Sequence, residues 1–368
     1  MRKVFIFLLL STVLFFAACN NEPTVESAPE VKTVSAFAYQ KSMDIGQEFD
    51  ESSVKIKVIF ADGSSQTYSG ADLGFDYSNF DPETIGKQTI KVRIKPLKNV
   101  STTITVEVNR VSIKILMIAN SFGDDTVQWV HEIGDDLGID FTIANMYIGG
   151  CTLATHLTNL ANNKAAYEYV SYNKATKTWS RKYNTSISDA MKLEDWDYIS
   201  LQQGSYESGR AESYDTINQV MDRILKLKDD VKFVWNMTWA YQQDSGHANF
   251  NIYNSDQMTM YNAIINAVQT KVVPNERFVS IIPNGTAVQN ARTSQIGDNL
   301  CRDIYCHLTL DFGRYIAGLT LVAVLAEVDI REVQYAPAGV DEIKKAIAIE
   351  SVVNALANPY VITESIYS

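Results

Sequence analysis

The hydrophobic pattern of this chain changes its period near residue 110, and this change constrains the fold more than any other feature. Before it, apolar and polar residues alternate, as in Val54 to Phe60 and Ile90 to Ile94. After it, short continuous apolar runs such as Ile115 to Ile118 alternate with stretches of helical spacing. Alternation predicts strands with one buried face, whereas continuous runs between helices predict a parallel sheet covered on both faces. We therefore expect two different domains.

The first domain is expected at residues 34–110 as a small all-β sandwich. Its candidate strands are short, and Ala61 to Ser64 reads as a hairpin turn between two of them. The run P-E-T-I-G-K-Q-T-I-K-V, with the D-G-S turn before it, resembles bacterial Ig-like domains of surface proteins. No cluster of titratable residues stands out in this segment, so a spacer role is the better interpretation than a glycan-facing one.

The second domain is expected at residues 111–368 as a three-layer α/β/α fold. Strands are predicted at 113–118, 141–147, 197–201, 231–237 and 278–282. Helices are predicted after Asp124 and at 186–193, 214–227, 256–272, 312–328 and 340–355. Strands that alternate with helices in this way favour a mainly parallel sheet with helices on both faces. The segment 167–183, rich in aromatic and polar residues, is left unassigned.

The N-terminus has the pattern of a targeting segment. Arg2 and Lys3 precede an apolar stretch that is short for a membrane span, and Ala17-Ala18-Cys19 follows. Small residues just before a cysteine resemble a bacterial lipobox. The resemblance implies a signal peptide at 1–18, lipidation of Cys19, a polar tether over 19–33, and attachment to a membrane of the bacterial cell envelope.

Composition narrows the partners. The net charge of −11 speaks against a nucleic-acid ligand, because such proteins concentrate lysine and arginine. The four histidines lack the spacing of a metal site and no phosphate-binding glycine loop is present, so we predict neither a metal nor a cofactor. Besides Cys19 the chain has Cys151, Cys301 and Cys306. A Cys301–Cys306 disulfide and three separate thiols are both compatible with this set.

Polar turns follow three of the predicted strands. Asn120-Ser121 follows the first strand, Gly149-Gly150 the second and Gln202-Gln203-Gly204 the third, and a late histidine, His307, stands before a helix. Open α/β sheets bind ligands outside the carboxyl ends of their strands. A helix N-terminus behind Ser121 would favour developing negative charge, and a nearby base would make its hydroxyl a nucleophile.

This order of blocks resembles the SGNH/GDSL hydrolases. More closely, the runs I-A-N-S-F-G-D-D, W-D-Y-I-S-L-Q-Q-G-S and H-L-T-L-D-F-G-R-Y-I-A-G-L-T resemble an SGNH-like branch of Bacteroidetes envelope proteins. The resemblance implies that Ser121 is the nucleophile, Gly150 an oxyanion donor and His307 the general base. Gln203 stands where the family has an asparagine and would donate its side-chain amide. Asp303 would orient His307, although it lies four residues before it, where the family spacing is three.

A second histidine competes with His307 for the role of base. Asp244 and His247 have the D-x-x-H spacing that the late block lacks, and they also follow a predicted strand. If His247 is not the base, it is expected to line the substrate cleft. The residues predicted to contact substrate are Asn120, Gln202, Trp239, Tyr241, Asp244 and His247.

Two functions follow from these residues. The first is a lipid-anchored serine esterase that removes acyl groups, with acetyl the expected group, from a glycan. The alternative is an SGNH-like surface lipoprotein that has lost catalysis and binds glycan, because the third block lacks its asparagine.

Overall fold

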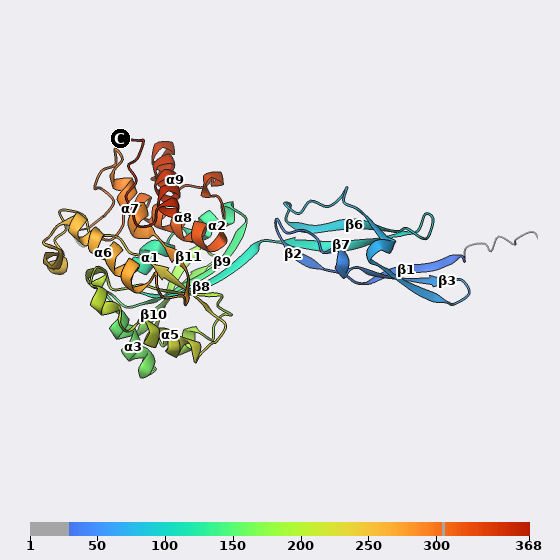
Figure 1. Ribbon diagram of the computed structural model, residues 1–368, viewed down its shortest axis with the longest axis horizontal. Helices are drawn as coiled ribbons and strands as arrows, with labels where there is room; N and C mark the ends of the chain where they lie inside the picture. Colours follow the sequence, from blue (N-terminus) through green and yellow to red (C-terminus); the bar gives the residue numbers. More distant parts are fainter. Residues whose placement is uncertain (1–28, 304–305) are drawn as a thin grey trace, which may run out of the picture. The chain divides into compact units, whose positions relative to one another are not determined.

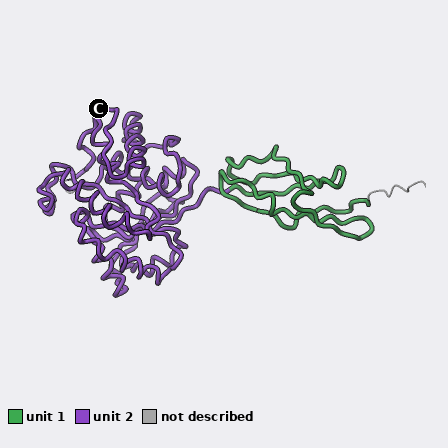
Figure 2. The backbone as a smooth tube through the Cα atoms, in the orientation of Figure 1, with its two compact units in different colours: residues 1–108 green, residues 109–368 purple. Residues whose placement is uncertain are grey.

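The computed structural model describes residues 29–303 and 306–368, and the chain divides into two compact units, 1–108 and 109–368 (Figure 2). The predicted signal peptide, the lipidation site Cys19 and most of the predicted tether lie outside the described residues. The last residues of that tether prediction, from Val31 onward, belong instead to the first strand.

The first unit consists of two antiparallel sheets. One sheet has the order β1-β3-β4 and the other β2-β7-β6-β5. The strands are β1 (Val31–Ala38), β2 (Ser42–Asp44), β3 (Lys55–Phe60), β4 (Ser65–Ser69), β5 (Leu73–Asp76), β6 (Gly86–Ile94) and β7 (Ser101–Asn109). Two short 3₁₀ turns are η1 (Glu51–Ser53) and η2 (Gly70–Asp72).

The core of this unit lies between its two sheets. Alternate residues of β3 and β6, such as Ile56, Val58, Ile90 and Val92, are fully buried, while the lysines between them are exposed. This is the inward and outward alternation that the sequence predicts, and a sandwich of two such faces forms the core. The Ig-like prediction for this segment is confirmed.

The second unit is built on a seven-stranded sheet with the order β11-β10-β9-β8-β12-β13-β14. Its strands are β8 (Val111–Ala119), β9 (Ile139–Tyr147), β10 (Tyr167–Asn173), β11 (Thr178–Thr185), β12 (Tyr198–Leu201), β13 (Lys232–Asn236) and β14 (Phe278–Ile282). The strands from β9 to β14 in the sheet order are parallel, and β10 and β11 extend the sheet antiparallel to them. Numbered along the chain, the parallel strands have the doubly wound order 2-1-3-4-5, whose switch point lies between β8 and β12.

Helices cover both faces of this sheet (Figure 1). The helices are α1 (Ser121–Val127), α2 (Val130–Asp136), α3 (Leu153–Ala161), α4 (Ile187–Ala190), α5 (Ile217–Leu225), α6 (Gln257–Lys271), α7 (Asn284–Arg292), α8 (Phe312–Ala326) and α9 (Glu342–Ala357), with 3₁₀ turns η3 (Ser205–Glu207), η4 (Ala211–Tyr214), η5 (Ala248–Tyr253) and η6 (Ile330–Glu332). One layer contains α3 against α5, and the other contains α8 packed against α1, α2, α7 and α9. The predicted α/β/α class is confirmed. Within the residues described, no helix is both long and apolar enough to cross a membrane.

The first helix begins four residues earlier than the sequence predicts. Asn120, not Asp124 or Asp125, caps it, because the Asn120 side-chain oxygen accepts the backbone N–H of Phe122 at 3.0 Å. Asp125 is fully buried inside α1, and the helix ends at Val127 before α2 starts. Ser121 is therefore the first residue of a helix that points its N-terminus at the sheet edge.

The unassigned segment 167–183 falls mainly in the hairpin of β10 and β11. β10 pairs antiparallel with β9, so the hairpin adds two strands beside the second parallel strand. Two helices, α3 and α7, were not predicted from the sequence. The hairpin brings Arg181 to the cavity at the carboxyl edge of the sheet.

Candidate active site

Ser121, Gly150 and His307 meet at the carboxyl edge of the parallel strands. Ser121 follows β8, and Gly149-Gly150 forms the turn after β9. His307 precedes α8 in the chain. All of these residues line a cavity of about 410 Å³. The structure thus brings together segments up to 186 residues apart in the sequence.

A Ser–His–Asp triad is formed. The Ser121 Oγ lies 2.9 Å from the His307 Nε2, and the His307 Nδ1 lies 2.9 Å from the Asp303 Oδ2. The backbone N–H of His307 also donates to the other Asp303 oxygen, at 3.3 Å. With Nδ1–H donated to the carboxylate, Nε2 is left to accept the serine proton. His307, not His247, is therefore the base that the geometry supports.

Backbone contacts on both sides keep Asp303 next to His307 although one more residue separates them than in the family pattern. Cys306 has φ of 98°, a value that L-residues rarely adopt, and its N–H donates to the Asp303 carbonyl at 3.3 Å. Cys301 and Leu308 form an antiparallel bridge across the loop, and the Arg302 N–H donates to the His307 carbonyl at 2.9 Å. These contacts between residues 301–303 and 306–308 hold the aspartate beside the histidine despite the longer spacing.

Two backbone N–H groups are available to hold an oxyanion. No hydrogen-bond acceptor is recorded for the N–H of Ser121 or Gly150 among the described residues. Ser121 opens a helix, where the helix dipole favours negative charge. Gly150 has φ of 61°, so a side chain there would strain the turn that presents its N–H.

The Gln203 side chain does not donate to this hole, contrary to the expected role. Its Nε2 donates to the Ser213 carbonyl and hydroxyl, both at 2.9 Å, and its Oε1 accepts the N–H of Leu153 at 3.0 Å and of Gly204 at 2.8 Å. Gln203 is 1% exposed. Its amide is fully used in joining the turn after β12 to the start of α3.

Asn120 and Gln202 are also buried rather than in the cavity. The Asn120 Nδ2 donates to the Cys151 carbonyl at 3.1 Å, which ties the nucleophile turn to the Gly150 turn. Gln202 donates to the Asn120 oxygen at 2.9 Å and accepts from Asn236 at 2.8 Å. These buried amides join the turns of the site to one another, and neither side chain lines the cavity.

The two aromatic residues that the sequence predicts to contact substrate, Trp239 and Tyr241, are part of the core. Trp239 and Tyr241 are both fully buried, and Trp235 is 1% exposed. The Trp239 ring stacks on Phe122 with centroids 4.2 Å apart, and its Nε1 donates to the Cys306 carbonyl at 3.0 Å. Trp239 therefore supports both the nucleophile helix and the loop of the base.

Asp244 and His247 separate in the structure. Asp244 is exposed and accepts from Gln242 at 2.9 Å, away from the cavity lining. His247 lines the cavity, and its Nδ1 accepts the N–H of Asn249 at 3.2 Å. Burial, with a smaller contribution from the charge of His307, lowers the pKa of His247.

Three arginines in the cavity lining were not singled out from the sequence. Arg181, from the β10–β11 hairpin, pairs with Asp124 and with Glu168 at 2.8 Å. Arg314, from α8, pairs with the buried Asp125 at 2.7 Å. The third, Arg302, lies beside the triad. The sequence did not predict them as site residues, because they lie far apart in the chain and come together only in the folded structure.

Asp125 links the nucleophile helix to the base. Its Oδ2 accepts the backbone N–H of Leu308, next to His307, at 2.9 Å. Burial raises the pKa of this carboxyl, and the charge of Arg314 acts in the opposite direction. The contact fixes the residue after His307 against α1.

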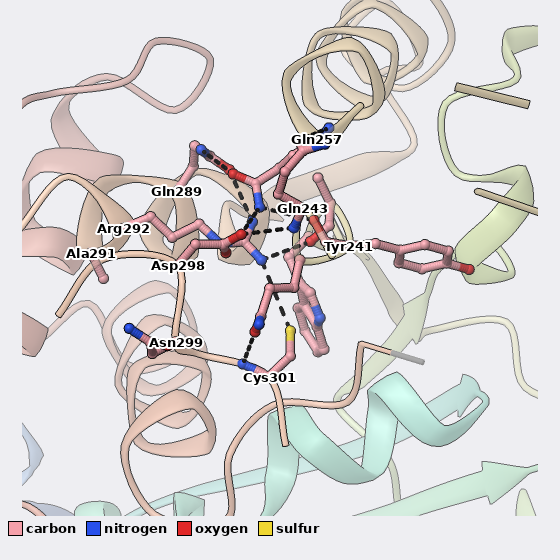
Figure 3. A network of polar contacts seen from close by, with 12 residues as sticks. Tyr241, Gln243, Gln257, Gln289, Ala291, Arg292, Asp298, Asn299 and Cys301 are labelled. Atoms are coloured by element: carbon pink, nitrogen blue, oxygen red, sulfur yellow. Dashed lines mark hydrogen bonds and ion pairs between the residues drawn. The ribbon is translucent and has the colours of Figure 1, made fainter. Parts of the chain in front are cut away.

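The loop that carries His307 is anchored at its start by a buried ion pair (Figure 3). We call residues 298–303 and 306–308 the base loop. Arg292 is 3% exposed, and its Nε lies 2.8 Å from Asp298. The other Asp298 oxygen accepts from the Gln243 N–H at 2.7 Å and from Gln257 at 2.9 Å. Three segments, which carry Arg292, Gln243 and Gln257, thus hold one end of the base loop.

Cys151, Cys301 and Cys306 are free thiols. Of the two possibilities the sequence leaves open, the structure has the unpaired one. Burial raises the pKa of Cys151 to about 12 and that of Cys301 to about 11. No group of three His, Cys, Asp or Glu side chains within 29–303 and 306–368 could hold a metal ion.

A serine, a histidine and an aspartate joined in this way at the carboxyl edge of a 2-1-3-4-5 sheet place the second unit among the SGNH/GDSL-type α/β proteins. Residues 114–355 match the family described as a domain of unknown function, DUF4886, and the chain belongs to that family. Residues 38–108 match the bacterial Ig-like domain, group 3.

The chain is also similar to several solved structures. A DUF4886 family protein from Bacteroides uniformis is 39% identical, with a TM-score of 0.64, and the match covers 69% of this chain and 98% of that one. A family 3 carbohydrate esterase from Clostridium thermocellum is 11% identical, with a TM-score of 0.37 and coverage of 60% and 98%. A lipolytic G-D-S-L family protein from Veillonella parvula is 15% identical, with a TM-score of 0.37 and coverage of 59% and 100%. A comparison with curated proteins gave no match.

Proposed function

We propose that the second unit is a serine esterase that removes acyl groups, acetyl foremost, from a glycan. The observation that carries the proposal is the 2.9 Å contact between Ser121 Oγ and His307 Nε2, with Asp303 on the other ring nitrogen. A neutral histidine oriented by a carboxylate is the base that a serine hydroxyl needs to attack an ester.

The reaction proceeds in two halves. His307 accepts the Ser121 proton while Oγ attacks the ester carbonyl, and the resulting oxyanion is held by the N–H groups of Ser121 and Gly150. His307 then protonates the leaving alcohol, which leaves an acyl ester on Oγ. Water attacks this ester, His307 accepts the water proton, and the proton returns to Oγ as the acid departs. One water is consumed, and each donor to the oxyanion contributes about 10²- to 10³-fold in rate.

Hydrolysis of 4-nitrophenyl acetate by the purified chain tests this proposal. Ser121→Ala is expected to remove the activity above the uncatalysed rate, and the same variant should no longer be labelled by a fluorophosphonate. His307→Ala is expected to lower kcat by at least about 10²-fold, while His247→Ala, which removes the rival histidine, should cost much less. Activity that survives Ser121→Ala would sink the assignment.

The alternative is a glycan-binding protein without catalysis. The observation that favours it is the Gln203 amide, which is used internally and leaves only two backbone N–H groups for the oxyanion. This alternative predicts an unreactive Ser121 in the fluorophosphonate experiment, together with retention on immobilised glycans.

The substrate class and location come from the sequence rather than from the cavity. We propose that Cys19 is lipidated, that the chain is anchored in the bacterial cell envelope, and that the Ig-like unit serves as a spacer that presents the esterase to a glycan. Incorporation of labelled fatty acid into the wild-type chain, and its loss in Cys19→Ser, tests the anchor.

A further inference from the structure

Arg302 places an uncompensated positive charge in the active-site cavity. Its side chain is exposed and lines the cavity together with Ser121 and His307. Arg181 and Arg314, the other two arginines of the lining, are each held in ion pairs. Among the described residues, no carboxylate or other side chain is recorded against the Arg302 guanidinium.

The position of Arg302 relative to the triad is fixed by the backbone. Its N–H donates to the carbonyl of His307 at 2.9 Å, and Asp303 follows it directly. The base loop is held at its other points by the Arg292–Asp298 pair and by the contact of Leu308 with Asp125. These contacts hold the Arg302 backbone beside the triad, and the exposed side chain lines the cavity from there.

The acids around the cavity are already occupied. Asp124 pairs with Arg181, Asp125 with Arg314, and Asp303 with His307. Arg302 is thus the lining arginine whose positive charge is not paired with one of these acids. It offers an anion a favourable site in a chain whose net charge of −11 would otherwise repel it. Its planar fork of donors matches a carboxylate, which can accept two parallel hydrogen bonds from it.

We propose that the enzyme acts on esters that carry a carboxylate close to the scissile bond, and that Arg302 binds this carboxylate. The inference rests on the proposed esterase function and narrows its substrate to an acylated acidic molecule. Arg302 would be a specificity-determining residue, because it contacts the substrate without taking part in proton transfer.

Two matched pairs of esters test the proposal. On the acid side, 4-nitrophenyl hemisuccinate is compared with 4-nitrophenyl methyl succinate, in which the carboxylate is masked. On the alcohol side, 4-acetoxybenzoate is compared with its methyl ester. The measured quantity is the ratio of kcat/KM for the charged and masked ester of each pair. Ser121→Ala supplies the background rate of each ester.

In at least one pair, Arg302→Gln is expected to lower this ratio by about 10-fold at low ionic strength, the effect of losing one charge-assisted interaction at an exposed site. Added salt should lower the wild-type ratio in the same pair, because it screens an exposed charge. Arg331→Gln is the matched control. Arg331 is an exposed arginine paired with Asp329 outside the cavity, so its loss changes the net charge equally and should leave both ratios unchanged.

The outcomes separate the two proposals. If wild type hydrolyses these esters but Arg302→Gln leaves both ratios as they were, the carboxylate inference is overturned and the esterase stands. If Arg331→Gln lowers the ratio as much as Arg302→Gln, the effect is one of net charge, and the inference also fails. If wild type hydrolyses none of the four esters faster than Ser121→Ala, both proposals fail.

Discussion

Asp303 reaches His307 across one more residue than the family spacing allows, and the orientation of the base depends on that contact. An asparagine at this position would keep the shape but present either an amide oxygen or an N–H to the His307 Nδ1. Binding of the amide N–H would favour the tautomer whose Nε2 already carries a proton and cannot accept one.

We expect Asp303→Asn to lower kcat for 4-nitrophenyl acetate by about 10²- to 10⁴-fold, the range for loss of general base catalysis. KM should change little, because Asp303 faces His307 and does not line the cavity. Steady-state kinetics measure both. A variant with unchanged kcat would show that the 2.9 Å contact between Asp303 and His307 has no part in catalysis.

At the scale of residues, the sequence could predict the position of site residues that directly follow a predicted strand. Ser121 and Gly150 follow strands, so the end of each strand fixes where they lie. The direction of the Gln203 amide could not be predicted, because it is set by Ser213 and Leu153, which come from other segments. A sequence shows which residue occupies a turn but not which of the competing partners it binds.

The segment that follows β13 supports the base loop through Trp239. The Trp239 Nε1 donates to the carbonyl of Cys306. Cys306 has φ of 98°, and this backbone conformation accommodates the longer spacing between Asp303 and His307. Trp239→Phe should keep the ring stacking on Phe122 and remove the donor. From the part of the chain that the structure describes, the Cys306 carbonyl then keeps a weak contact with the Cys301 thiol, at 3.4 Å.

We expect Trp239→Phe to lower kcat several-fold and the free energy of unfolding by about 1 kcal/mol, the net worth of one buried hydrogen bond. Trp235→Phe is the matched control. Trp235 lies on β13, and its buried Nε1 has no partner within the described residues. If both variants lower kcat equally, loss of packing rather than the hydrogen bond is responsible.

The Arg292–Asp298 pair anchors the start of the base loop to α7 (Figure 3). Arg292→Met would leave a partly buried carboxylate without its cation. Since Asp298 is 30% exposed, the cost should lie below the range for fully buried pairs, at about 2 kcal/mol of unfolding free energy. Urea unfolding measures the loss, and kcat should fall with it because the loop carries His307.

Arg277→Met is the comparison for that variant, because Arg277 pairs with Asp222 at the surface. Such exposed pairs contribute at most about 1 kcal/mol. If both variants lower the free energy of unfolding equally, the Arg292–Asp298 pair stabilises the protein no more than a surface ion pair does. Its role as the anchor of the base loop would then be contradicted.

At the scale of elements, the period of the apolar residues predicted most strands but not every helix boundary. Asp124 and Asp125 suggested a helix start because acids favour the first turn, yet Asn120 provides the cap. Asp125 is instead buried against Arg314 from α8, a partner that no local pattern reveals. The β10–β11 hairpin was unassigned because its mixed polar and aromatic residues cover a sheet edge and have no single buried face.

The chain as a whole has two separate hydrophobic cores, one in each unit. All five tryptophans, from Trp129 to Trp239, belong to the second unit. Tryptophan fluorescence therefore reports unfolding of the second unit alone, even in the full chain. This separation makes the pH dependence of that unit measurable without truncation.

His131 gives the second unit a stability that falls toward acid pH. It is 6% exposed, stacks on Tyr172 with ring centroids 4.0 Å apart, and its Nε2 has no partner within the described residues. Burial, with a smaller effect of the Lys174 charge, lowers the pKa of His131 to about 4. Between about pH 6.5 and 4 the unfolded chain binds a proton that the folded chain does not, so unfolding becomes easier as pH falls.

Between pH 7 and pH 5 the free energy of unfolding should decrease in both the wild type and His131→Phe. We expect the decrease in His131→Phe to be smaller by about 2 kcal/mol. The phenyl ring keeps the stacking on Tyr172 and removes the titrating group. Other buried groups with shifted pKa values, His156 with a pKa of about 3 and Asp125 with a raised pKa, contribute equally to the pH dependence of both proteins. Urea titrations followed by tryptophan fluorescence at pH 7, 6 and 5 give the comparison. Parallel pH profiles would mean that folded His131 binds its proton as readily as unfolded His131, which the buried, unpartnered Nε2 argues against.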